Sequence, residues 1–146
     1  MFTSALLVLL SSAFVASQMI DFFEGCVPMG EEQDSGGCVL GPQSWLTMST
    51  FRRYANLALA NAHIQPEEGH LNTLLRLTRI ATEWTDGFTI ILEFTTAKST
   101  CDSSVAYSED KCPPLYSQAN GLCQAVIKNN DGINVEDAWC VPLFED

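Results

Sequence analysis

Apolar residues recur at two different periods along the chain, and the change of period marks the predicted elements. Between Phe51 and Ala62 they recur every three or four residues, which predicts an amphipathic helix. In 74–84 and 88–96 they alternate with polar residues, which predicts two strands with one buried face each. The first run falls out of phase, and a β-bulge near Thr78 would restore the alternation.

Polar turn residues separate the predicted strands. Asp86-Gly87 lies between the two long runs, and Asn129-Asn130-Asp131-Gly132 lies between two shorter ones, 124–128 and 133–139. Both turns end in an Asp-Gly pair, whose residues tolerate the positive φ that tight hairpins need. One helix followed by two antiparallel hairpins predicts an α+β fold, in which one helix packs in a curved antiparallel sheet of four or five strands.

The beginning of the chain has the pattern of a secretory signal peptide. Residues 1–20 carry no charged side chain, 6–10 form an apolar block, and Val15 and Ser17 are small residues at positions −3 and −1 of a cleavage site. Residues 1–17 are therefore predicted to be a leader. A membrane anchor is the alternative, but serines interrupt the run, which falls short of the ~20 apolar residues of a spanning helix. We expect a secreted, extracellular protein with no membrane partner.

The mature chain divides into two parts by composition. Residues 18–42 are rich in glycine and acidic residues and are predicted to form an N-terminal arm that leads into the folded domain, 43–146. All six cysteines follow the leader, and an even number in a secreted chain predicts three disulfides. Cys26 and Cys38 are expected to close the arm into a ring, although either could pair elsewhere.

The other four cysteines lie in the second half of the chain. Cys101 and Cys112 are expected to close a polar excursion, and a bridge between Cys123 and Cys140 would fix the open end of the last hairpin. No two cysteines have the C-x-x-C spacing of a metal site, so neither a metal nor a cofactor is expected.

Charge and chemistry exclude several classes of function. The chain has 18 acidic and 7 basic residues, for a formal net charge of −11. Such a surface repels phosphate, so nucleic acid is excluded as a partner. A cysteine nucleophile needs a free thiolate beside a base, but all six cysteines are expected to be paired and the only histidines are His63 and His70. The chain is therefore expected not to be an enzyme.

Four features between Val39 and Cys140 resemble the type 2 cystatins, which are secreted inhibitors of papain-like cysteine proteases. They are the helix 51–58 with its arginine pair, the strand from Gly87 to Cys101, the two C-terminal cysteine pairs in sequential order, and Val39-Leu40-Gly41-Pro42. The last resembles the apolar trunk that the family places ahead of its helix. The resemblance implies a cystatin-like domain over residues 43–146, preceded by the disulfide-closed arm and trunk, 18–42.

In that family the trunk and two hairpin tips enter the protease cleft together and occlude it. The resemblance places the protease-binding positions of this chain on the trunk Val39, Leu40 and Gly41, on the first tip Glu83, Trp84, Thr85, Asp86 and Gly87, and on the second tip Asn130, Asp131 and Gly132. Of the family's first-tip motif Q-x-V-x-G only Gly87 matches, and the second hairpin lacks the Pro-Trp pair. The bridge between Cys26 and Cys38 is foreign to the basic family pattern.

Two functions follow from the resemblance and its departures. The first is a secreted inhibitor of papain-like, cathepsin-type cysteine proteases, which requires Gly41, Gly87 and Gly132 to lie along one rim of the molecule. The alternative is a non-inhibitory secreted binding module that keeps the scaffold and presents different loops to another partner. We expect a monomer, with a domain-swapped dimer hinged at Asp86-Gly87 as the alternative.

Overall fold

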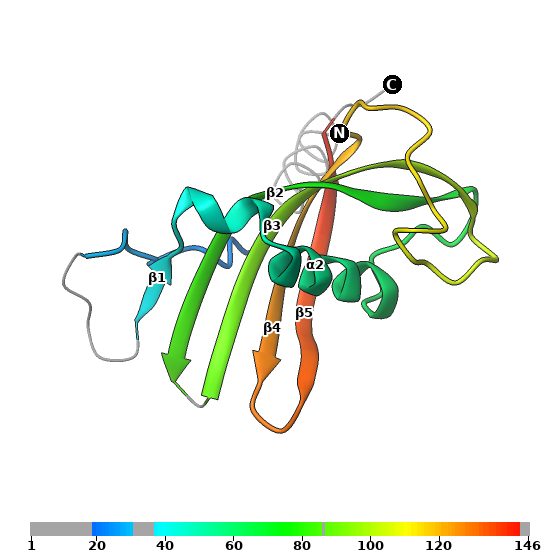
Figure 1. The fold of residues 1–146 in the computed structure, drawn as a ribbon. Helices are drawn as coiled ribbons and strands as arrows, with labels where there is room; N and C mark the ends of the chain where they lie inside the picture. Colours follow the sequence, from blue (N-terminus) through cyan, green and yellow to red (C-terminus); the bar gives the residue numbers. More distant parts are fainter. Residues whose placement is uncertain (1–18, 31–36, 86, 144–146) are drawn as a thin grey trace, which may run out of the picture.

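The fold is one α-helix packed on a five-stranded antiparallel sheet (Figure 1). The computed structural model describes residues 19–30, 37–85 and 87–143, so the predicted leader, 1–17, and Asp86 lie outside the described residues. The elements are β1 (Cys38–Leu40), the 3-10 helix η1 (Gln43–Thr47), α2 (Ser49–Asn61), β2 (His70–Thr85), β3 (Gly87–Asp102), β4 (Gly121–Asn129) and β5 (Ile133–Pro142). The strands neighbour one another in chain order, each antiparallel to the next. The predicted α+β class is therefore confirmed, with five strands.

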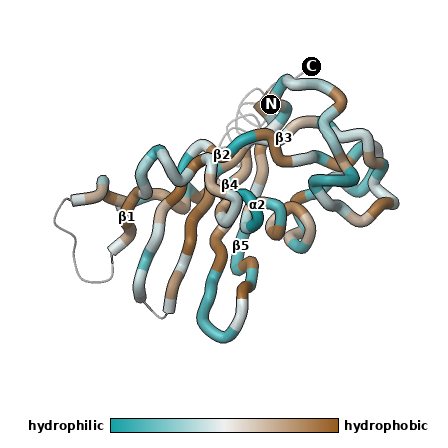
Figure 2. The backbone as a smooth tube through the Cα atoms, in the orientation of Figure 1, coloured by the Kyte–Doolittle hydropathy of each residue, from teal (hydrophilic) through white to brown (hydrophobic). Residues whose placement is uncertain are grey.

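The main core lies between α2 and one face of the sheet. The helix buries Phe51, Ala55, Ala58 and Leu59. The sheet presents alternate apolar residues to it, because side chains alternate between the two faces of a strand; these are Leu74, Leu77, Ile80, Ile90, Leu92, Phe94, Ala125 and Ile127. Figure 2 shows that hydrophobic residues concentrate on the central strands, whereas the turn between β4 and β5 is hydrophilic.

Strand β2 carries the irregularity that its sequence predicts. The pairing between β2 and β3 shifts between Leu77 and Arg79, which leaves Thr78 as the extra residue of a bulge. Two further shifts lie nearer the start of β2, between His70 and Asn72 and between Leu74 and Arg76. Because the bulges absorb the phase changes, β2 and β3 run together for 16 residues each, well beyond the predicted strand ends.

All three predicted disulfides are confirmed: Cys26–Cys38, Cys101–Cys112 and Cys123–Cys140. Every cysteine is thus paired, and three bridges in a chain of this size fit an oxidising, extracellular environment. In the residues that the structure describes, no helix is long and apolar enough to cross a membrane.

The N-terminal arm is packed across the sheet rather than forming a free loop. We call its segment Met19–Val27 the strap. At one end the indole Nε1 of Trp139, in β5, donates to the carbonyl oxygen of Ile20 at 2.7 Å. At the other end the amide of Val27 donates to the carbonyl oxygen of Cys38, in β1, at 3.0 Å. The strap therefore crosses from one edge strand to the other.

The middle of the strap covers the sheet face opposite α2. Phe23 is only 5% exposed and packs with Ala81 of β2 and Ile91 of β3 in a second, smaller core. Both neighbours alternate with residues of the main core, so they point away from the helix. The strap thus gives the outer face of the sheet an apolar cover of its own.

A charged cluster fixes the strap beside Phe23. Glu93 of β3 is 8% exposed, and the guanidinium of Arg79 donates to its two carboxylate oxygens at 3.0 and 2.5 Å. The side-chain amide of Gln124 donates both to Glu93 Oε2 and to Asp21 Oδ1, each at 2.9 Å. The guanidinium of Arg79 also lies 4.3 Å from the ring centre of Phe23. The cluster therefore joins β2, β3 and β4 to the strap.

The environment of Glu93 gives the fold a dependence on pH. Burial alone would raise the pKa of Glu93, but hydrogen bonds from Arg79, Gln124 and Thr78 outweigh it and hold the pKa below its ordinary value. The ionised carboxylate is therefore the form that stabilises the fold. Its contribution is complete above the pKa of an unfolded glutamate, about 4.3, and is lost as the pH falls through the lower pKa of the folded state.

We expect Glu93→Gln to lower the free energy of unfolding by about 2 kcal/mol at pH 7, because charged hydrogen bonds are lost while Arg79 stays in place. At pH 3 or below the difference from the unmodified protein should shrink, since Glu93 itself becomes neutral. Urea denaturation at a series of pH values measures both quantities. The same replacement at the exposed Glu67 is the control. A difference that stays constant down to pH 2 would contradict the assignment.

Candidate hairpin-rim site

The two hairpin turns lie side by side at one end of the sheet (Figure 1). Strand β3 pairs with β4 so that Phe88 faces Asn129, which makes the turns before Gly87 and after Asn129 neighbours. A Cβ atom placed on Gly87 would lie 3.0 Å from the Cβ of Asn130. We call this end, formed by Trp84, Gly87 and Asn130–Gly132, the hairpin rim. The side chain of Thr85, like Asp86, lies outside the described residues.

The trunk assigned by resemblance does not reach the hairpin rim. Strand β1 runs antiparallel to β2, with Cys38 opposite Glu83 and Leu40 opposite Ala81. The amide of Gly41 then donates to the carbonyl oxygen of Ile80 at 2.8 Å. Because Ile80 is five residues from the end of β2 at Thr85, Gly41 is about 16 Å from the rim along the strand. The prediction that Gly41 shares one rim with Gly87 and Gly132 is wrong.

The assigned trunk makes its contacts within the molecule itself. Leu40 packs against the small core around Phe23, and Val39 pairs with Val27 of the strap in a parallel bridge. The start of β1 at Cys38, opposite Glu83, is the part of this strand nearest the rim. The pattern Val-Leu-Gly-Pro is the basis for assigning the trunk to 39–41, but the register of β1 on β2 determines where these residues lie.

Gly41 has a packing role instead. A Cβ atom at this position would lie 2.3 Å from Cε3 of the Trp45 indole, closer than any real Cβ contact. The Trp45 ring in turn stacks on Phe51 of α2, with ring centres 5.1 Å apart. Glycine at position 41 therefore lets the backbone approach the Trp45 ring, which packs against the main core.

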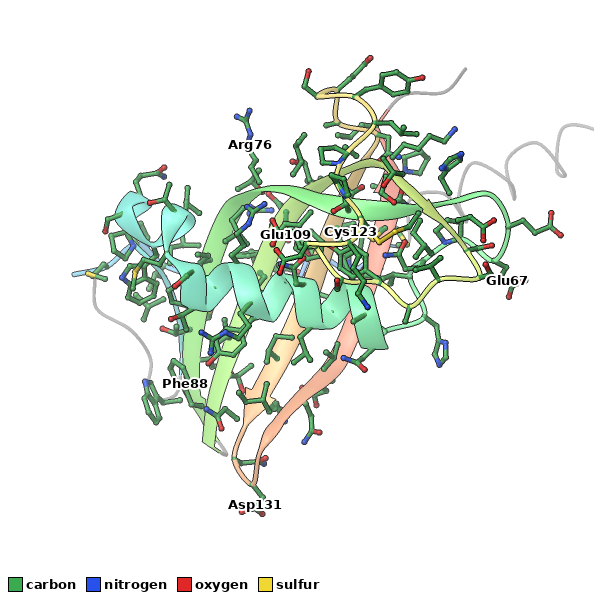
Figure 3. All side chains as sticks on the ribbon, turned by 45° about the vertical axis from the view of Figure 1, so that its right-hand side comes forward. Glu67, Arg76, Phe88, Glu109, Cys123 and Asp131 are labelled. Atoms are coloured by element: carbon green, nitrogen blue, oxygen red, sulfur yellow. A yellow bond between two sulfur atoms is a disulfide. The ribbon has the colours of Figure 1, made fainter. Side chains whose placement is uncertain are left out.

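The residues of the rim itself are polar, glycine or exposed aromatic. Trp84 is 69% exposed, and its ring centre lies 4.6 Å from that of Phe88 on the facing strand. Asn130, Asp131 and Gly132 are exposed, and the amide of Asp131 donates to Asn130 Oδ1 at 2.9 Å. Figure 3 shows Phe88 and Asp131 at this same end of the molecule, beyond α2. The rim thus combines one large apolar side chain with carboxylate and amide groups.

Gly87 and Gly132 provide a matched test of the contact between the two turns. Both have positive φ, +99° and +123°, so alanine is strained at either position. Only the alanine at position 87 would also collide with Asn130, since nothing lies within 4 Å of a Cβ at position 132. We expect backbone strain alone to cost each variant about 1–2 kcal/mol of stability in urea denaturation.

The collision should make the two losses differ. If the two turns pack against each other, Gly87→Ala should lose more stability than Gly132→Ala, because it also displaces Asn130 in the second turn. Urea denaturation of both variants gives the two values, and equal losses would mean that the turns are not in contact.

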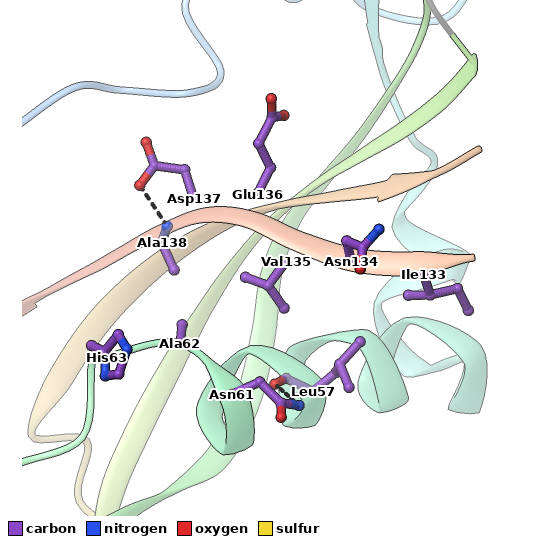
Figure 4. A pocket seen from close by; sticks show the side chains of 10 residues that line it. All are labelled: Leu57, Asn61, Ala62, His63, Ile133, Asn134, Val135, Glu136, Asp137 and Ala138. Atoms are coloured by element: carbon purple, nitrogen blue, oxygen red, sulfur yellow. Dashed lines mark hydrogen bonds between the residues drawn. The ribbon is translucent and has the colours of Figure 1, made fainter. Parts of the chain in front are cut away.

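A groove lies near the rim, between the end of α2 and β5 (Figure 4). Its volume is about 720 Å³, and it is lined by Leu57, Asn61, Ala62, His63 and 133–138. Figure 4 shows that Val135 points toward the helix, whereas Glu136 and Asp137 point away from it. Asp137 accepts a hydrogen bond from the amide of Ala138 at 2.9 Å. The two carboxylates of this part of β5 therefore point away from α2.

The described part of the chain offers surface rather than reactive groups. No group of three metal-ligating side chains comes together among these residues. All six cysteines are in disulfides, so no thiol is available as a nucleophile. What the geometry provides is a double-hairpin end that another molecule can contact.

Comparison with known proteins identifies the fold. No family model and no curated protein matches the chain. Among solved structures, mialostatin, a gut cystatin from the hard tick Ixodes ricinus, matches with a TM-score of 0.61 and 25% identity over 73% of this chain and 98% of its own. The salivary cystatin of the soft tick Ornithodoros moubata matches with a TM-score of 0.61 and 22% identity, covering 74% of this chain and 99% of that one.

A more distant match extends further along the chain. Dimeric human cystatin F matches with a TM-score of 0.59 and 13% identity over 81% of this chain and 96% of its own. These structures share the arrangement of one helix on an antiparallel sheet that is described above. By its fold the chain is a divergent type 2 cystatin-like protein.

Proposed function

We propose that the protein is a secreted, reversible inhibitor of papain-like cysteine proteases, and that its hairpin rim occludes the active-site cleft. The observation that carries the proposal is the contact between the two turns, where Gly87 lies against Asn130. Two adjacent turns form a thin edge that fits a groove. The cystatin-like fold supports the choice of a papain-like protease as the owner of that groove.

The rim is suited to tight binding because long paired strands and a disulfide support it from behind. Strands β2 and β3 support the first turn over 16 residues each, and the disulfide Cys123–Cys140 ties β4 to β5 behind the second turn. Rigid turns lose little conformational entropy on binding, so more of the contact energy appears as affinity. Inhibition by occlusion requires no reactive group from this chain, in line with its paired cysteines.

The charge of the rim indicates what kind of cleft it fits. Asp131 is exposed on the second turn, Glu83 lies beside the first, and the whole chain carries a formal net charge of −11. A carboxylate that is carried into a groove without a partner loses its hydration at a cost of several kcal/mol. The target protease is therefore expected to carry basic side chains at the margins of its cleft, which would also speed association.

Inhibition assays test the proposal directly. Protein 18–146, folded with its three disulfides, is titrated against papain and a panel of cathepsins with a peptide substrate. We expect reversible inhibition at nanomolar concentrations for at least one protease, with an association rate that falls as salt is added. Absence of inhibition at micromolar protein across the panel would overturn the proposal.

The secretion that the proposal assumes has its own measurement. The leader 1–17 is expected to be removed after Ser17 when the full chain is expressed in a secreting cell. N-terminal sequencing of protein from the medium should then begin at Gln18. Retention of the protein in the cell with residues 1–17 attached would contradict the expectation.

A non-inhibitory binding module on the same scaffold is the second candidate. It is favoured by the turns, which keep only Gly87 of the family's first-tip motif, and by Gly41, which is used for packing Trp45 instead of a trunk. The inhibition panel separates the two candidates, because a binding module leaves every protease active. In that case the partner of the rim is a protein of another class.

A further inference from the structure

We propose that Trp84, Phe88 and Ile133 form an exposed apolar row behind the hairpin rim, and that this row binds an apolar surface beside the cleft of the target protease. The proposal rests on the proposed function and names a second contact of the same site. It adds Phe88 and Ile133, which no motif assigns to binding, and it gives Trp84 a specific role.

Strand register places these side chains in one line. Trp84 faces Phe88 across β2 and β3, Phe88 faces Asn129 across β3 and β4, and Asn129 faces Ile133 across β4 and β5. Directly opposed residues of antiparallel strands point to the same face of a sheet. The row therefore spans four strands, with the polar Asn129 of β4 between Phe88 and Ile133, and at the usual strand spacing it is about 14 Å long.

The row lies on the same face as α2 but is not covered by the helix. Phe88 packs at the margin of the main core, and Ile133 lines a groove together with Leu57 of α2. Even so, Trp84 remains 69% and Ile133 46% exposed. Contiguous exposed apolar surface marks contact sites on soluble proteins, whereas exposed apolar residues that are scattered singly do not.

The position of the row identifies its occupant. The row lies directly behind the two turns. A groove deep enough to cover both turns and one further pair of residues therefore also contacts the row. The second turn, 129–132, consists only of polar residues and glycine and offers no apolar anchor of its own. Tryptophan is enriched among the residues that dominate binding energy at interfaces. Trp84 thus supplies, from the first hairpin, the apolar anchor that the second lacks.

A second copy of the chain is a poorer occupant. Each copy carries a formal net charge of −11, so face-to-face contact of two rims would be opposed by like-charge repulsion. A protease with basic groups around its cleft meets the same surface with complementary charge. The apolar row and the acidic turns therefore point to one partner with both features.

Alanine replacement of Trp84 tests the row, and Tyr116 provides a matched control. Tyr116 is an aromatic residue of equal exposure, 68%, in the segment between β3 and β4, outside the rim. For the protease that the unmodified protein inhibits, Trp84→Ala should raise the inhibition constant at least tenfold and Ile133→Ala about threefold, whereas Tyr116→Ala should change it less than twofold. Trp84→Phe, which keeps an aromatic side chain, should recover most of the loss.

Thermal unfolding and sedimentation of each variant complete the experiment. If Trp84→Ala inhibits as well as the unmodified protein does, the row is wrong while the proposed function stands. If the unmodified protein inhibits nothing, both fail together. If the unmodified protein is a dimer that Trp84→Ala converts to a monomer, the row belongs to a second copy and the proposal is overturned. An equal loss of inhibition in Tyr116→Ala would overturn it as well.

Discussion

Replacing Phe23 by alanine is expected to lower the free energy of unfolding by about 3–4 kcal/mol, a large share of the stability of a domain of this size. Phe23 is 5% exposed, and its neighbours Ala81 and Ile91 lie on the sheet face that the strap covers. Its ring also faces the guanidinium of Arg79 at 4.3 Å. Removal of the ring leaves a cavity and detaches the strap from the charged cluster beneath it.

The neighbouring Phe22 is the control for this replacement. It is half-buried, and its ring centre lies 6.3 Å from that of Trp139, so Phe22→Ala should cost no more than about 1.5 kcal/mol. Urea denaturation of both variants, with the disulfides intact, gives the two values. Equal losses, or a loss below 1 kcal/mol for Phe23→Ala, would mean that the strap contributes little to the fold.

Removing the disulfide Cys26–Cys38 with a double serine replacement is expected to reduce both the stability of the fold and the proposed inhibition. The bridge spans a sequence separation of 12, and closing a ring of this length stabilises a fold by about 3 kcal/mol in the chain-entropy model. The bridge also holds the start of β1, where Cys38 pairs with Glu83 two residues before the end of β2. Loss of that support should weaken inhibition at least tenfold.

The disulfide Cys101–Cys112 supplies a matched control for the second effect. Its sequence separation is 11, so its removal should cost nearly the same stability. It closes the excursion that follows β3, at the opposite end of that strand from Gly87. We expect the variant without Cys101–Cys112 to keep its inhibition constant within threefold. If both variants lose inhibition equally, the arm has no special connection with the rim.

The helix and the hairpins could be predicted because their signals are local. The spacing of apolar residues from Phe51 to Ala62 is a property of one short segment, as is Asp86-Gly87 between two alternating runs. Even the bulge at Thr78 leaves a local trace, since the phase of the alternation changes there. The three disulfides could be predicted because the six cysteines pair in sequential order, and each pair encloses one local loop or hairpin.

The strap and the true position of Gly41 could not be predicted in this way. The strap is held by contacts between residues about a hundred positions apart, such as Phe22 with Gln124 and Ile20 with Trp139. Nothing in the sequence near Phe23 distinguishes a buried strap from a loop. The trunk was misplaced because a short apolar pattern before Gly41 says nothing about which residue of β2 it will face.

The turns of the candidate site could be predicted from the sequence, but the row behind them could not, because it depends on strand register. The turn residues at Gly87 and Asn130–Gly132 are visible in the sequence, and their proximity follows once β3 pairs with β4. The row from Trp84 to Ile133 requires the register of three strand pairs at once. Each of its members looks like an ordinary strand residue by itself.

Calorimetric titration against two forms of the most strongly inhibited protease of the panel tests whether the hairpin rim enters the protease cleft. In one form a carboxamidomethyl group blocks only the active-site cysteine, and in the other a covalently bound peptidyl inhibitor fills the whole cleft. We expect submicromolar binding of protein 18–146 to the first form and no binding to the second. Equal binding to both forms, or binding to neither, would contradict this placement of the rim.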